Sequence, residues 1–146
     1  MNIEDRGPAD ESVTVIRVVS EDIKPPKNDG SRGSALYAVP FLLSHRPSST
    51  WVQVFVETWN HPPQWSSMHR PGIARVIGDQ IILDGTTVEE IEKYHKETLL
   101  LAVNEANHIT AEYEQKQHQM QILEEARLQQ EKKRIEDFAQ RIRFDE

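Results

Sequence analysis

Residues 86–146 contain neither glycine nor proline, and this constrains the fold more than any other feature of the chain. Without these residues, nothing in the local sequence stops a helix once it has begun. Thr87 is a good N-cap, and Glu90 follows three residues later, which is the capping-box pattern of a helix start. A continuous helix from this point would hold about 57 residues and measure roughly 85 Å. The preceding domain of about 75 residues should be only some 25–30 Å across.

Apolar side chains recur along this predicted helix at a spacing of three or four residues, which is typical of a single buried stripe. The first set is Leu99, Ala102, Ala106, Ile109, Tyr113, Met120 and Leu123. The pattern then slips and resumes with Leu128, Ile135, Phe138 and Ile142. Residues 99–103 are apolar almost all round and should be buried, whereas residues 115–121 are polar on nearly every face. A one-stripe helix in water needs a partner, so its second half should extend beyond the head, fold back near 124–128 or pair with another chain.

Two segments before the helix predict strands. VTVIRVV (13–19) is dense in β-branched residues, and ALYAVPFLL (35–43) is almost entirely apolar, as expected of a strand buried on both faces. Pro40 cannot donate a ladder hydrogen bond, which predicts an edge or a bulge at that point. Residues 20–34 between them are rich in proline, glycine and serine and should form a surface connection.

A β-hairpin is predicted farther along the chain. Gly78-Asp79 supplies a two-residue turn, with glycine available for a positive φ. The flanking segments 74–77 and 80–83 are its two strands.

Residues 48–59 (SSTWVQVFVETW) fit either a helix or a strand. As a strand, the segment would place a Glu and a Gln on the same face as its three aromatic residues. As a helix, it has an N-cap in its first serines and one apolar stripe of Trp51, Phe55 and Trp59 flanked by valines. We favour the helix, with these three aromatic residues in the core of the domain.

These elements predict an α+β protein. A small head with short strands, a C-terminal β-hairpin and one short helix would be followed by a single long C-terminal helix. We expect a disordered tail at 1–11, the head at 12–110 including the first part of the long helix, and a coiled-coil-like or partner-bound helix at 111–146.

Composition excludes several classes of function. The chain has no cysteine, so thiolate zinc sites, iron–sulfur clusters and cysteine nucleophiles are ruled out. Its net charge of −7 argues against binding to nucleic acid, which needs clustered Lys and Arg. No apolar run approaches the roughly 18 residues of a membrane helix, and the N-terminus is acidic without a signal-peptide core. We expect a cytoplasmic protein that binds neither nucleic acid nor membrane.

No motif predicts a catalytic residue, a metal or a cofactor. His45, His61 and His69 could hold a zinc ion in principle, but their spacing matches no short metal motif. Two Glu-x-x-His pairs, Glu92–His95 and Glu105–His108, lie about 20 Å apart on one helix and cannot share a metal pair. The alternative hypothesis is a metal-dependent hydrolase or small-ligand binder that uses the loop histidines His45, His61 and His69 with Arg46 or Arg70.

The hypothesis that we prefer is a non-catalytic interaction, adaptor or assembly module that uses the long helix for oligomerisation or docking. Tryptophan and arginine are enriched in interface hot spots, so a loop with both is a plausible second contact surface. The expected partner-binding residues are Trp65, His69, Arg70, Met120, Leu123, Leu128, Ile135, Phe138 and Ile142.

Overall fold

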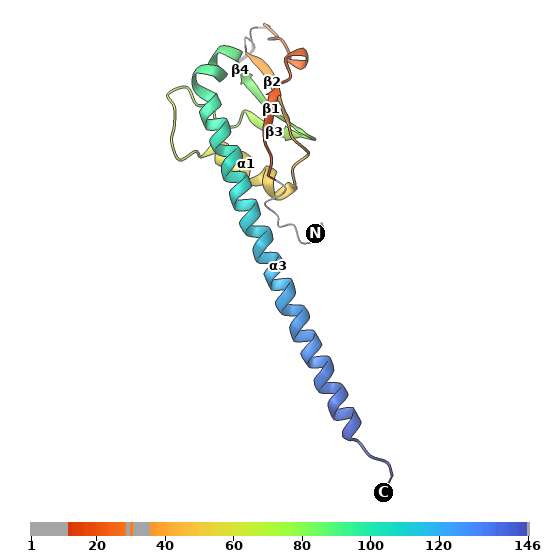
Figure 1. The fold of residues 1–146 in the computed structure, drawn as a ribbon. Helices are drawn as coiled ribbons and strands as arrows, with labels where there is room; N and C mark the ends of the chain where they lie inside the picture. Colours follow the sequence, from red (N-terminus) through yellow and green to blue (C-terminus); the bar gives the residue numbers. More distant parts are fainter. Residues whose placement is uncertain (1–11, 29, 31–35, 146) are drawn as a thin grey trace. The chain divides into compact units, whose positions relative to one another are not determined.

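A computed structural model describes residues 12–28, 30 and 36–145. The predicted tail at 1–11 lies outside the described residues, and so does part of the predicted connection at 20–34. The α+β architecture is confirmed: the structure has a four-stranded antiparallel sheet, one short helix between its second and third strands, and a long C-terminal helix (Figure 1). A 3₁₀ turn, Ser20–Asp22, follows the first strand.

The sheet has the strand order β1-β2-β4-β3. Its strands are β1 (Val15–Val18), β2 (Tyr37–Leu43), β3 (Ala74–Ile77) and β4 (Gln80–Thr86), and every neighbouring pair is antiparallel. The hairpin of β3 and β4 turns at Gly78, which has a φ of 60°. This confirms the predicted turn.

Pro40 was predicted to lie at an edge or a bulge because it lacks an N–H, and the structure places it at neither. Strand β2 is an inner strand, and the register shifts of its two ladders fall at Tyr37/Ala38 and at Val15/Arg17. In an antiparallel strand the N–H and C=O of one residue point to the same side. The Pro40 carbonyl accepts from the Val19 N–H (2.9 Å), just beyond the end of β1, so the proline nitrogen faces that side and leaves the β2–β4 ladder intact.

One face of the sheet carries the hydrophobic core. Val39, Phe41 and Leu43 alternate on β2, and their cross-strand neighbours Ile81 and Leu83 lie on β4. The other face carries the intervening residues, among them the exposed ion pair of Arg75 and Asp84.

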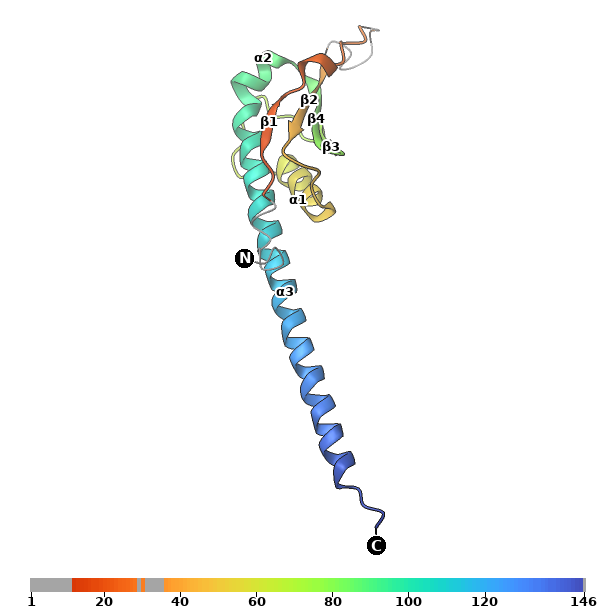
Figure 2. The same ribbon diagram turned by 45° about the vertical axis from the view of Figure 1, so that its right-hand side comes forward.

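Helix α1 (Ser49–Asn60) covers the core face, which settles the segment 48–59 as a helix. The Ser48 hydroxyl accepts from the Trp51 N–H at 3.2 Å, so the predicted N-cap is confirmed. Trp51, Phe55 and Trp59 are at most 2% exposed, as expected for core residues. Figure 2 shows α1 beside the teal part of the long helix, below that helix's first turns.

The C-terminal helix is continuous through three segments, of which the middle one is π-helical and the other two are α-helical. Helix α2 (Val88–Glu90) leads into a π-helical turn (Ile91–His95), and α3 (Lys96–Arg141) follows without a break near 124–128. Thr87 caps its start by accepting from the Glu90 N–H at 3.1 Å. Leu99, Ala102, Val103 and Ala106 are buried in the core, although Leu100 in the same apolar run is 43% exposed. The expectation of burial all round this run is therefore wrong at Leu100.

The chain divides into two compact units, residues 1–111 and residues 112–146. The first unit contains the sheet, α1 and the beginning of α3, and the second contains the rest of α3. Within the described part of the chain, no helix combines the length and the apolar character that crossing a membrane requires.

Candidate functional site

An aromatic and imidazole cluster lies where the loop after α1 meets the π-helical turn. The rings of Trp59 and His69 are 4.7 Å apart between centroids, and those of Trp59 and His95 are 5.8 Å apart. His69 and His95 face each other edge to face at 6.4 Å. The sequence separates these residues widely, so only the fold brings the two histidines together.

His95 is the most unusual member of this cluster. Its side chain is fully buried, and neither ring nitrogen has a hydrogen-bond partner among the described residues. Burial lowers the pKa of His95, and the positive charge of Arg70 and the neighbouring His69 act in the same direction, whereas Glu90 opposes them. His95 is therefore held in its neutral form.

The π-helical turn explains how a histidine beside charged residues comes to be buried. Ile91 and His95, which open and close the turn, both point into the core, while Glu92 and Lys93 between them are exposed. The sequence presented His95 only as part of a Glu-x-x-His pair. Such single π turns are often found at functional sites, but the local sequence gives no reliable sign of them.

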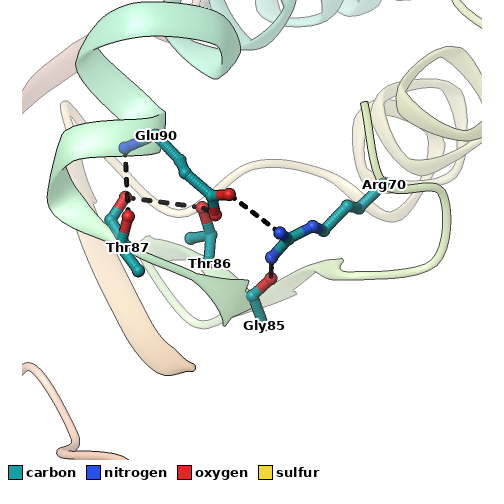
Figure 3. A network of polar contacts seen from close by, with 5 residues as sticks. All are labelled: Arg70, Gly85, Thr86, Thr87 and Glu90. Atoms are coloured by element: carbon teal, nitrogen blue, oxygen red, sulfur yellow. Dashed lines mark hydrogen bonds and ion pairs between the residues drawn. The ribbon is translucent and has the colours of Figure 1, made fainter. Parts of the chain in front are cut away.

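Arg70 lies beside the cluster and joins the loop to two other elements (Figure 3). Its guanidinium donates to the Gly85 carbonyl at 2.6 Å and to the Glu90 carboxylate at 2.8 Å. The second Glu90 oxygen accepts from the buried Thr86 hydroxyl at 3.2 Å. The Arg70 carbonyl accepts from the Trp59 indole N–H at 3.0 Å. Both the side chain and the backbone of Arg70 therefore bind within this unit.

Trp65 and His69, the other two predicted contact residues of this loop, differ in exposure. Trp65 is 56% exposed, and its ring lies edge to face with the His69 ring at a centroid distance of 5.0 Å. The His69 Nε2 lies 2.7 Å from the Trp59 carbonyl, which accepts when that nitrogen is protonated. Of the loop triad, Trp65 presents the largest apolar surface to solvent.

The three loop histidines have separate surroundings. His45 lies next to the Ser44 hydroxyl, and His69 belongs to the cluster described above. His61 borders a surface hollow of about 560 Å³ between α1 and α3, together with Glu57 and Glu105. Among residues 12–28, 30 and 36–145, no three His, Cys, Asp or Glu side chains form a group that could hold a metal ion.

The second unit carries the remaining predicted contact residues. Between Glu112 and Asp145 every side chain is exposed except that of Glu114, which is partly buried. The large apolar side chains there are 50–69% exposed, apart from the still more exposed Phe144. Those predicted as partner-binding are Met120, Leu123, Leu128, Ile135, Phe138 and Ile142.

These side chains gather on one side of α3. At about 100° per residue, the apolar residues from Tyr113 to Phe138 fall within an arc of roughly 140°, and the slip between Leu123 and Leu128 keeps them there. Ile122 is the exception and points to the opposite side. Ile142 lies one residue beyond the end of α3.

Charged residues share this arc. Arg127 pairs with Glu124 at 2.6 Å, and Arg134 pairs with Glu131 at 2.7 Å. The guanidinium groups of Arg134 and Arg141 lie 5.7 and 5.3 Å from the Phe138 ring. Apolar side chains therefore alternate along the stripe with charged side chains that form ion pairs within the helix.

No protein-family model, no curated protein and no solved structure matches this chain.

Proposed function

We propose that this chain is a non-catalytic protein–protein interaction or assembly module of the cytoplasm, and that the second unit is its docking element. The observation that supports this most directly is the exposed apolar stripe on residues 113–138 of α3. Burying one large aliphatic or aromatic side chain is worth about 1.5–3 kcal/mol, so a helix with six of them on one side gains considerably from a partner.

The length of the helix supports the same proposal. From Glu112 to Arg141 it measures roughly 45 Å at about 1.5 Å per residue. Isolated helices are marginal in water, and their stability in proteins comes mainly from packing of an apolar face. A partner on the stripe would supply that packing.

Trp65 adds a second contact surface to the proposal. Its ring is more than half exposed and lies against the His69 ring. Arg70 acts as a support for this loop because its donors already bind Gly85 and Glu90. The alternative, a metal-dependent hydrolase or ligand binder, has no comparable observation in its favour because the loop histidines have separate surroundings.

The chain contains a matched pair of variants that tests the role of the stripe. Leu123 and Ile122 are adjacent and similarly exposed (69% and 51%), but only Leu123 lies on the stripe. We expect Leu123→Glu to abolish self-association or partner binding and Ile122→Glu to leave it unchanged, as measured by sedimentation velocity and by co-purification with the full-length chain. If the full-length protein is monomeric at tens of micromolar and nothing co-purifies, the proposal is wrong.

A further inference from the structure

We infer that the partner of the stripe is a second copy of this chain, and that residues 116–142 of the two copies pair antiparallel, centred on the level of position 129. This inference rests on the proposed function and specifies its partner. It follows from the order of apolar and charged residues on one side of α3.

In a symmetric antiparallel pair, each residue before the centre comes level with the residue equally far after it. Met120 then meets Phe138 of the second copy, nine positions to either side of Gln129. Leu123 comes level with Ile135, six positions to either side. These two pairs bring apolar residues level with one another, in layers of the kind that pack coiled coils, whereas Leu128 comes level with Gln130 and Ile142 with Lys116.

The charges of the stripe match in the same register. Arg127 comes level with Glu131 of the second copy, two positions to either side of the centre, and both lie near the middle of the arc. Glu124 comes level with Arg134, five positions to either side. Opposite charges therefore share each of these levels.

A parallel, in-register pair would do the reverse. Glu131 would face Glu131 of the second copy, and Arg127 would face Arg127. Like charges opposed at the centre of an interface are costly and select against that arrangement. The charges therefore favour the antiparallel arrangement, which the apolar residues alone would not decide.

The ion pairs within one chain are compatible with this exchange. Glu124–Arg127 and Glu131–Arg134 are each three residues apart, and their side chains are 47–63% exposed. Exposed pairs of this kind contribute little to stability. The same four side chains can therefore re-pair across the interface at little cost.

Disulfide trapping tests the orientation directly because the chain has no cysteine of its own. The variants Met120→Cys and Phe138→Cys are made separately in the full-length chain, one with a mass tag, and are oxidised alone and mixed. We expect a covalent dimer only in the mixture. In the antiparallel pair the two copies of residue 120 lie roughly 27 Å apart, whereas a disulfide needs Cα atoms within about 7 Å.

A charge exchange provides a second readout that needs no crosslink. Arg127→Glu and Glu131→Arg should each raise the Kd of the dimer about tenfold or more, because each places like charges on one level. The double variant should return the Kd toward that of the original chain. Tryptophan fluorescence checks that the first unit stays folded, since all three tryptophans lie in it.

The outcomes separate this inference from the proposed function. Crosslinking of Met120→Cys alone, or a dimer that gives no crosslink in the mixture, overturns the antiparallel register and leaves the interaction role standing. A monomer that binds a different protein through Leu123 overturns self-pairing and also leaves that role standing. A monomer without any partner overturns both.

Discussion

The side chain of Asn107 pairs with the backbone of Val13 as a neighbouring strand would. Its Oδ1 accepts from the Val13 N–H at 2.8 Å, and its Nδ2 donates to the Val13 carbonyl at 2.8 Å. The same Oδ1 also accepts from the Trp51 indole N–H at 2.8 Å. One amide on α3 therefore joins the segment before β1 to the first turn of α1.

Asn107→Ala should lower the free energy of unfolding by about 3 kcal/mol, because it leaves two backbone groups and one indole N–H without their partner. Asn107→Asp keeps the acceptor but sets an oxygen against the Val13 carbonyl in place of the Nδ2 donor, so it should also lower the free energy of unfolding. Denaturant unfolding followed by tryptophan fluorescence measures both. Asn104→Ala, an exposed position on the same helix, serves as the control and should change stability by less than about 0.5 kcal/mol. Equal effects at positions 104 and 107 would contradict the assigned role.

Removing the charge of Glu90 should loosen the network around Arg70. Glu90→Gln is expected to cost about 1.5–3 kcal/mol in unfolding free energy, as is usual for a hydrogen bond to a charged group. The side chains of this pair are 28% and 18% exposed, so water replaces the lost contact poorly.

Asp84→Asn is the matched control, since it breaks the ion pair of Arg75 and Asp84, whose side chains are about half exposed. We expect that change to cost less than about 1 kcal/mol. A larger loss from Asp84→Asn than from Glu90→Gln would show that burial does not decide the strength of these pairs.

The buried His95 should make the protein less stable in mild acid. Its pKa is lowered in the fold from an ordinary value of 6.5, so the unfolded chain takes up a proton at a higher pH than the folded one. Its contribution to stability is complete above pH 6.5 and is lost as the pH falls from there through the lowered pKa. The melting temperature measured between pH 7.5 and 5 should fall accordingly.

His95→Leu should flatten this dependence, since it removes the titrating group without breaking a hydrogen bond to the described residues. Three ionisable side chains face His95, namely Glu90, His69 and Arg70. Glu21 acts in a separate pH range. The hydrogen bond from Arg17 lowers the pKa of Glu21 to about 2, so the contribution of Glu21 to stability is lost only below pH 4.5. An unchanged slope in the His95→Leu variant would assign the effect to another group.

Helix content should rise with protein concentration if the second unit gains its stability from a partner copy. Circular dichroism at 222 nm reports on α3, whereas the tryptophan spectrum reports on residues 51–65 of the first unit. We expect the first signal to change over the concentration range of dimer formation and the second to stay constant. Helicity that is independent of concentration, in a protein that sedimentation shows to dimerise, would mean that the helix is stable without the partner.

Several elements could be predicted because local interactions suffice to form them. The Ser48 and Thr87 side chains cap helices that begin one residue later, and Gly78 takes the positive φ of a hairpin turn. Each depends on atoms within four residues, so each is visible in the sequence. The apolar stripe of α3 could be predicted for the same reason, because helical spacing alone defines it.

Other features depend on contacts between distant segments. Residues 48–59 fit both periodicities, and burial of Trp51, Phe55 and Trp59 against the sheet selects the helix. Pro40 lies on an inner strand because β1 ends where its missing N–H would be needed.

The sequence by itself determined the strands, the start of the long helix, the hairpin and the apolar stripe of the long helix, since all of these follow from local backbone preferences and spacing. Only the tertiary structure decided that His95 is buried against His69 and Trp59, and that Arg70 binds Glu90 rather than facing solvent. The physical reason is that burial and pairing across more than ten residues depend on how the sheet and helices pack. A π-helical turn and a shared core bring these side chains together, and neither leaves a periodic pattern in the chain.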